Sequence, residues 1–327
     1  STEQEFHADC AISNANTPNR NRILGHFSDE MSRMGLRHSV TPSQLAYNGA
    51  ELDGHAITRT KGSTMRHLTF FLTAMLASVA PLASAADWPQ WRCDANRSGA
   101  TQEQCSDEMT LQWVRDLGRP DPAYDHQYRM CADAGYAPVA ADGRLFVPSN
   151  RGDSVTAFDL TSGDVAWRYV TEGPVRMAPL VDAGRVYFGS DDGHLYCVDA
   201  DQGAFQWRVR GVPEDTPESR MLVNGRIASR WPVRGAPVAH KGVVYFGSGL
   251  WPEEGVYVCA VDAGSGEVLW RDNRLSYLKD GMSDHGKAYD LGLPPHGYLA
   301  IIDGKLAVPS GRSLAAWFDL EPGELEP

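Results

Sequence analysis

The chain lacks the short motifs that mark several common catalytic and cofactor sites. No Cys-x-x-Cys-His occurs, which excludes the usual attachment of a c-type haem. No Gly-x-Ser-x-Gly, His-Glu-x-x-His or glycine-rich phosphate loop occurs either, so the sequence carries no signature of a serine hydrolase, a zinc protease or a nucleotide phosphate site. We therefore identify no catalytic set of residues.

The 327-residue chain also lacks an excess of positive charge. Its formal net charge is −12 at pH 7, which argues against a general nucleic-acid surface. We expect no nucleic-acid partner. The balance fits an exported protein and says little else about function.

No apolar run is long enough for a membrane span. The run from Leu68 to Leu82 is shorter than the ~20 residues that a transmembrane helix needs. It follows Met65-Arg66-His67 and ends in Ala83-Ser84-Ala85, and a basic start, a short apolar core and an Ala-x-Ala site indicate a secretory signal peptide. We predict a signal peptide over residues 65–85 and a periplasmic or secreted protein without a membrane span after cleavage.

Residues 1–64 precede this predicted signal peptide. They are polar and show neither strand nor helix periodicity. We interpret them as a non-native or disordered upstream extension, with a genuine cytoplasmic extension as the alternative.

Few cysteines are available for disulfides. Export would permit a Cys93–Cys105 bridge around the opening loop, with Cys131 as a competing partner. Cys197 and Cys259 fall in predicted strands, so we expect them to be buried as small apolar side chains.

What the chain does contain is a fourfold repeat. Each copy has a Gly turn, an apolar strand, a second strand ending in Asp, a Gly four residues after that Asp and, in three copies, a Trp eight residues after it. The copies contain Asp159, Gly163 and Trp167; Asp199, Gly203 and Trp207; Asp262, Gly266 and Trp270; and Asp319 with Gly323. The Asp positions differ by 40 (199 − 159), 63 (262 − 199) and 57 (319 − 262) residues.

This repeat predicts an all-β fold. Spacings of roughly 40–50 residues with several short strands per unit are typical of β-propeller blades. Arg185–Ser190 and Leu195–Asp199 form a predicted hairpin, and we interpret Asp191-Asp192-Gly193 between them as a plain turn rather than a Ca²⁺ loop. The repeated Trp is expected to pack between neighbouring blades. Leu111-Gln112-Trp113 fits the closing strand of another blade.

The repeat resembles a known family. Phe158-Asp159-Leu160-Thr161-Ser162-Gly163-Asp164-Val165-Ala166-Trp167 and its copies resemble the pyrroloquinoline-quinone-like (PQQ-like) propeller repeat, found in quinoprotein dehydrogenases and in a non-enzymatic outer-membrane assembly scaffold. Asp87-Trp88-Pro89-Gln90-Trp91-Arg92 is similar to the start of secreted bacterial proteins with such repeats. The resemblance covers about residues 87–327.

The resemblance implies a ring of seven or eight blades. About four blades are recognisable, so we expect an incomplete propeller. We predict an opening segment over residues 86–134 and partial propeller repeats over 135–327.

One set of equivalent residues is a candidate binding site. Counting back eight residues from the first turn Gly of each repeat gives Gly135, Arg176, Arg234 and His296. Equivalent positions of consecutive blades face the same way, and arginine binds carboxylates and phosphates, so Arg176, Arg234 and His296 predict an anion or quinone site at a central funnel. The alternative is that each arginine caps carbonyls or pairs with an Asp of the adjacent blade.

The longer segments between repeats add two weaker candidates. Arg230-Trp231 and Asp284-His285 could line the same funnel, with solvated loop residues as the alternative interpretation of Asp284-His285.

Two functions follow. The first is an exported binding or scaffolding protein whose partner is another protein or an anionic small molecule. The alternative is a quinoprotein oxidoreductase, an alcohol or sugar dehydrogenase, with PQQ and Ca²⁺ as its cofactors. The chain has no adjacent Cys pair, which quinoprotein alcohol dehydrogenases place against their quinone, and this departure puts their chemistry in doubt.

Overall fold

The computed structural model describes residues 87–104, 107–122, 133, 135–223, 225–284, 287–310 and 315–321. All of them belong to one of two compact units, Val79–Pro327. The predicted extension over 1–64 and signal peptide over 65–85 lie outside the described residues, and the division at residue 135 stays a prediction. None of the helical segments described is long and apolar enough to cross a membrane.

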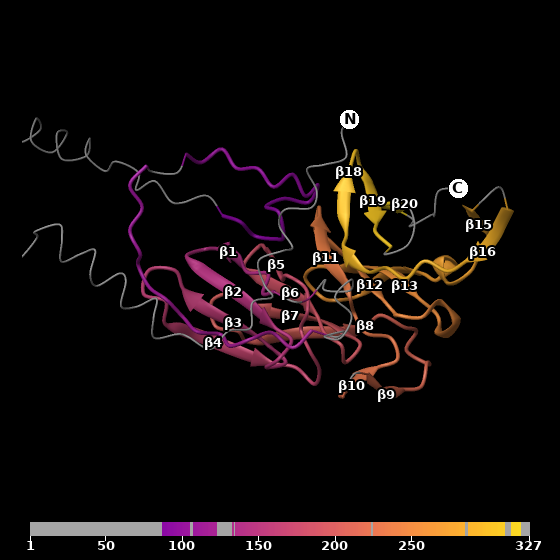
Figure 1. Cartoon of the computed structure of the whole chain (residues 1–327), viewed down its shortest axis with the longest axis horizontal. Coiled ribbons are helices and arrows are strands. Elements are labelled where there is room, and N and C mark those ends of the chain that lie inside the picture. Colours follow the sequence, from indigo (N-terminus) through magenta and orange to yellow (C-terminus); the bar gives the residue numbers. More distant parts are fainter. Residues whose placement is uncertain are drawn as a thin grey trace, which may run out of the picture. The chain divides into compact units, whose positions relative to one another are not determined.

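Four antiparallel sheets follow one another along the chain (Figure 1). The first is β1 (Val139–Ala141), β2 (Arg144–Ser149), β3 (Ser154–Asp159) and β4 (Val165–Val170). The second is β5 (Leu180–Asp182), β6 (Arg185–Gly189), β7 (His194–Asp199) and β8 (Phe205–Arg210). The third is β11 (Gly235–His240), β12 (Val243–Ser248), β13 (Tyr257–Asp262) and β14 (Val268–Asp272), with β17 (Gly297–Tyr298) added parallel to β11. The fourth is β18 (Ala300–Ile302), β19 (Lys305–Val308) and β20 (Ala316–Asp319).

The remaining elements lie in the longer connections. They are the hairpins β9 (Arg220–Val223) with β10 (Arg226–Ser229) and β15 (Leu278–Asp284) with β16 (Lys287–Leu291), and the short 3₁₀ turns η1 (Pro252–Glu254) and η2 (Arg274–Ser276). The all-β prediction is confirmed, and the successive antiparallel sheets are blades of a β-propeller built from the repeat.

The repeated Asp and Gly form the turn between the last two strands of a blade. Asp159 Oδ1 accepts hydrogen bonds from the amides of Thr161 and Ser162 at 3.0 and 2.8 Å, and the same pattern recurs at Asp199 and Asp262. Gly163 has φ = +71°, which side chains with a Cβ rarely adopt. Because these bonds are local, every copy can form the same turn from the same short phrase.

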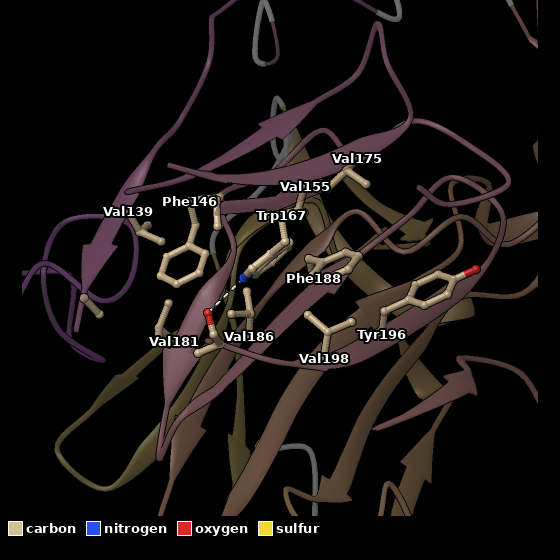
Figure 2. Packing of buried hydrophobic residues seen from close by; sticks show 14 residues of the cluster. Val139, Phe146, Val155, Trp167, Val175, Val181, Val186, Phe188, Tyr196 and Val198 are labelled. Atoms are coloured by element: carbon tan, nitrogen blue, oxygen red, sulfur yellow. Dashed lines mark hydrogen bonds between the residues drawn. The ribbon is translucent and has the colours of Figure 1, made fainter. Parts of the chain in front are cut away.

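The repeated Trp joins one blade to the next, as predicted. Trp167 in β4 lies over Gly203 of the second blade, where an added Cβ would come within 2.6 Å of the indole. Its Nε1 donates to the carbonyl of Ala200 at 3.0 Å, drawn as a dashed line in Figure 2. Around it, Phe146 and Val186 from two blades share one buried apolar cluster. Similar clusters join the second blade to the third and the third to the fourth.

An opening segment contacts the innermost strands of the four blades that the structure describes. Trp88 bridges to Ala140 in β1, and the carbonyl of Pro89 accepts from the amide of Val181 in β5 at 2.7 Å. Further along, the Ala95 carbonyl accepts from the amide of Ile301 in β18 at 2.8 Å. Arg97 completes the set: its guanidinium donates to the carbonyls of Pro237 in β11 and of Leu299, beside β18.

Of the predicted cysteine pairs, only one member is described. Cys93 lies half-buried at the opening segment, whereas Cys105 and Cys131 lie outside the described residues. Cys197 and Cys259 are fully buried in β7 and β13, as predicted. Burial raises the pKa of both thiols to about 12, so they stay protonated and behave as apolar side chains.

Candidate functional site

Arg176 lies in the segment that leads from β4 into β5. The segment is fixed because the Pro174 carbonyl accepts from the amide of Asp191 at 2.9 Å and Val175 is buried. The Arg176 Nε then donates to Asp191 Oδ2 at 2.7 Å, and its Nη1 donates to Asp133 Oδ2 at 2.5 Å. Nη1 also reaches the carbonyl of Asp121 at 3.2 Å.

Arg234 occupies the equivalent position immediately before β11. Its Nε donates to Asp191 Oδ1 at 2.9 Å and its Nη2 to Asp191 Oδ2 at 2.8 Å. Arg234 therefore binds the Asp191 carboxylate in the bidentate geometry typical of a guanidinium. Arg176 and Arg234, which enter successive blades, therefore converge on one carboxylate in the β6–β7 turn.

Asp191 is the centre of the cluster and is only 2% exposed. Burial by itself would raise the pKa of Asp191, but the charges and hydrogen bonds of Arg234 and Arg176 outweigh burial and hold that pKa below its usual value. With Asp133, the cluster holds two positive and two negative charges. The pairing of an arginine with an Asp of the adjacent blade, considered above as the alternative, is what the structure contains at Arg234.

His296 lies beside this cluster. The chain after it pairs with β11, with Gly297 opposite Gly235 and its amide bonded to the Arg234 carbonyl at 3.2 Å. Burial, and then the charge of Arg234, lower the pKa of His296 to about 4. The imidazole is therefore neutral at pH 7. Its buried Nε2 has no hydrogen-bond partner among the described residues.

One aromatic ring, that of Tyr298, lies two residues beyond His296 in the chain. Tyr298 follows His296, and its hydroxyl accepts from the amide of Ala178 at 3.3 Å. The Tyr298 ring stacks on Trp91 of the opening segment, with centroids 4.1 Å apart and planes 8° apart. Through Trp91, the opening segment therefore packs against a residue only two positions from His296.

The other candidates have structural contacts. Arg230 pairs with Glu254 Oε2 at 2.6 Å, and Trp231 Nε1 donates to the Glu254 carbonyl at 2.7 Å. The Asp191-Asp192-Gly193 turn is the hairpin connection that the sequence predicts. Gly135, the first-blade equivalent of the arginines, is exposed. The side chains of Asp284 and His285 lie outside the described set.

Sequence reasoning identified the two arginines but missed both carboxylates that hold them. Asp191 lies in a turn whose sequence is sufficiently explained by turn formation, and Asp133 has no repeat equivalent. A signal was nevertheless present: the positions eight residues before Asp159, Asp199 and Asp262 are Arg151, Asp191 and Glu254, so an acidic residue recurs there in two of three copies.

A PQQ cofactor would need cations for its carboxylates and an aromatic floor, and its Ca²⁺ would need clustered oxygen ligands. The described residues do not fit these needs. Arg176 and Arg234 direct their guanidiniums at Asp191, and Trp167 and Trp207 lie over the turns at Gly203 and Gly266. Within the described ranges no group of three acidic, His or Cys side chains could hold a metal ion.

Comparison with known proteins relates the chain to both branches of the PQQ-like repeat proteins. It is 33% identical over 147 residues to the dehydrogenase subunit of a quinone alcohol dehydrogenase from Gluconacetobacter polyoxogenes, covering 41% of this chain and 19% of that protein. It is 22% identical over 231 residues to the outer membrane protein assembly factor BamB of Yersinia pestis, covering 71% of this chain and 52% of BamB. The chain thus spans about a fifth to a half of the length of these relatives.

Solved structures include the quinohemoprotein alcohol dehydrogenase of Comamonas testosteroni, at 19% identity and a TM-score of 0.48, covering 75% of this chain and 41% of that one. The family model described as outer membrane protein assembly factor BamB matches residues 89–276, more than half of the chain. This chain therefore belongs to that family of PQQ-like β-propeller repeat proteins.

Proposed function

We propose that the chain is an exported binding or scaffolding propeller whose partner is another protein. The observation that carries this proposal is that Arg176 and Arg234 are both paired with Asp191 of the same chain. The repeated arginines that could have bound a cofactor bind a carboxylate of the protein itself. In this arrangement they join the second blade to the third.

Two further features support the proposal. The matching family is described as an outer-membrane assembly factor, and an assembly factor acts through contacts with other proteins. The sequence at residues 65–85 has the form of a signal peptide, which supports a periplasmic or secreted location. The acidic net charge of −12 disfavours nucleic acid as the partner.

An anionic small molecule is the weaker ligand for this site. Such a ligand would have to displace Asp191 from both arginines, and burial makes that exchange costly because Asp191 would be left as an unpaired charge. His296 offers one buried nitrogen without a described partner. Because His296 is neutral at pH 7, its imidazole offers no positive charge to an anion.

A quinoprotein dehydrogenase is the second candidate, favoured by one observation. The relative with 33% identity is a quinone alcohol dehydrogenase subunit, and its similarity extends over 147 residues. Under this alternative, most of the residues that hold the quinone and supply a base would lie outside the cluster around Asp191.

A titration with PQQ and Ca²⁺ separates the two candidates. A scaffold should bind neither, and should reduce no dye when an alcohol or a sugar is added. The Arg176→Ala and Arg234→Ala double variant is the control. If PQQ bound the wild type and binding were lost in the double variant while the fold stayed intact, the scaffold proposal would be wrong.

A further inference from the structure

A pocket with a volume of about 350 Å³ lies between residues 119–122 and the turn that joins β2 to β3. Its lining residues are Arg119, Pro120, Asp121, Pro122 and Arg151. Sites for small molecules span roughly 300–1,000 Å³. This pocket therefore has room for one or two side chains or for a small organic ion.

Hydrogen bonds from a buried asparagine hold the two walls of the pocket together. Asn150 is 4% exposed. Its Oδ1 accepts from the amide of Asp121 at 2.9 Å, and its Nδ2 donates to the carbonyl of Asp133 at 2.9 Å. Arg151, the next residue, donates from Nη1 to the carbonyl of Arg119 at 3.4 Å. The walls are thus joined at two points, so the pocket is formed before a ligand binds.

The charges that line the pocket are unequally compensated. The Asp121 carboxylate accepts from Arg226 Nη1 at 2.9 Å, so its charge is already paired, and Arg226 also pairs with Asp153. Among the described residues, no carboxylate forms an ion pair with the guanidinium of Arg119 or Arg151. The pocket therefore offers two unpaired positive charges in a chain whose formal net charge is −12.

A third guanidinium lies at the same turn. Arg168 in β4 donates from Nη2 to the carbonyl of Gly152, next to Arg151, at 3.0 Å. Its Nε donates to the Ser154 hydroxyl at 3.0 Å. Because both acceptors are neutral, the charge of Arg168 adds to the positive potential at the pocket. Asp116, the nearest remaining acidic residue in the sequence, is exposed and accepts from a backbone amide.

Two prolines give the pocket its apolar surface. Pro120 and Pro122 flank Asp121 and are half-buried. Proline has a fixed φ and no N–H, and the amide of Asp121 already donates to Asn150. The donors left for a ligand are thus guanidiniums, and the wall beside them contacts apolar groups. This combination fits a carboxylate on a short apolar stem, which is the structure of a glutamate side chain.

We propose that this pocket binds acidic side chains of a partner protein, with Arg119 and Arg151 donating to their carboxylates. The inference rests on the proposed function as a protein-binding propeller. Both arginines are exposed, and single ion pairs at exposed arginines contribute little because water and salt screen them. A free dicarboxylate should therefore bind weakly, whereas several carboxylates held on one chain bind more tightly through their effective concentration.

Fluorescence anisotropy with two labelled hexapeptides tests the chemistry. Both have blocked termini; one alternates Glu with Leu, and the other alternates Gln with Leu. The Glu–Leu peptide should bind at least about tenfold more tightly, because hydrogen bonds between charged partners are the stronger ones. Its affinity should fall as NaCl is raised. Equal binding of the two peptides would overturn the proposal.

Variants of the pocket locate the binding. The double variant Arg119→Gln with Arg151→Gln should raise the dissociation constant of the Glu–Leu peptide at least about tenfold. Arg115→Gln is the matched control: the Arg115 side chain is 40% exposed in the same segment but already pairs with Asp164. Unchanged melting temperatures would show that the variants fold. An equal loss in the control would overturn the assignment to this pocket.

Competition with glutarate distinguishes a partner's side chains from a free dicarboxylate. Glutarate should displace the Glu–Leu peptide only at concentrations far above the dissociation constant of the peptide, and glutarate that bound as tightly as the peptide would overturn the choice of a protein ligand. Absence of peptide binding would overturn the pocket but leave the proposed function standing. The titration with PQQ and Ca²⁺ tests that function separately, because it does not depend on Arg119 or Arg151.

Discussion

Two regions bury arginine side chains against the inner strands, and they satisfy the guanidiniums in different ways. Arg176 and Arg234 pair with the carboxylate of Asp191. Arg97 donates to neutral acceptors, the carbonyls of Leu299, Trp91 and Pro237 and the side chain of Gln90.

This difference affects the charge state of each region. Burial lowers the pKa of Arg97 to about 10, although the charges of Tyr298 and Asp94 act in the opposite direction. In the Asp191 cluster, opposite charges compensate the cost of burial for both partners. The stability of the Asp191 cluster should therefore depend on keeping every charge, whereas the stability of the region around Arg97 should depend on its hydrogen bonds.

The largest effect is expected on removing the shared carboxylate. Asp191→Ala leaves Arg176 and Arg234 buried without their common counter-ion, which should lower the free energy of unfolding by about 3–5 kcal/mol. Urea unfolding measures the change. Asp201→Ala is the control, because Asp201 pairs with Arg144 but is 71% exposed and should cost under about 1 kcal/mol. Equal losses in the two variants would contradict the central role of Asp191.

The second effect depends on pH and comes from His296. Its pKa is about 4 in the folded chain and about 6.5 when unfolded. Because the unfolded state binds the proton more tightly, stability should be full above pH 6.5 and should fall as the pH drops from 6.5 to 4. The loss is on the order of 3 kcal/mol. Asp191, with its lowered pKa, adds a separate loss that begins only below about pH 4.

Unfolding free energies of the wild type and His296→Gln at pH 7 and pH 4.5 test this expectation. The variant should lose less stability between the two pH values. His240→Gln, which removes an imidazole from the far end of β11, controls for the substitution itself. If His296→Gln kept the full wild-type loss, the titration would belong to another group.

Much of the fold could be predicted because its determinants are local and repeated. The Asp of each turn bonds amides two and three residues away, and each Trp packs on the following blade at a fixed place. The sequence pattern of the Asp turn and of the Trp contact therefore occurs several times in the chain. The positions of Arg176 and Arg234 could be predicted for the same reason.

The partners of these residues could not be predicted because they follow no repeat. Asp191 is 43 residues from Arg234, and turn formation already accounts for an Asp at its position. Arg97 bonds to carbonyls of the backbone, which every residue possesses, so no side chain in the sequence reveals its acceptors. The partners of these arginines are thus the contacts that the sequence indicates least.

The third effect concerns the neutral acceptors of Arg97. Arg97→Met keeps an unbranched side chain but removes hydrogen bonds to the third and fourth blades, and should cost about 2–3 kcal/mol. Arg92→Met is the control in the same segment. Arg92 is exposed, and its guanidinium lies over the Trp91 ring, 5.4 Å from the ring centroid. Thermal unfolding of both variants checks the order. A larger loss for Arg92→Met would contradict the role assigned to Arg97.

The smallest effect is expected at the blade junctions, where the indole N–H of one Trp has a hydrogen-bond acceptor and that of another has none among the described residues. Trp167 Nε1 donates to the Ala200 carbonyl, whereas the buried Trp207 Nε1 has no acceptor among the described residues. There the equivalent carbonyl, that of Ala263, accepts from the Tyr187 hydroxyl at 3.0 Å.

Replacing either Trp by Phe removes similar apolar area, but only Trp167→Phe also breaks a hydrogen bond and leaves a carbonyl unpaired. Trp167→Phe should therefore cost about 1 kcal/mol more than Trp207→Phe in urea unfolding. The two substitutions control for each other because both indoles cover a turn glycine and are equally buried. Equal costs would mean that the shape of the indole, and not its hydrogen bond, sets the strength of a junction.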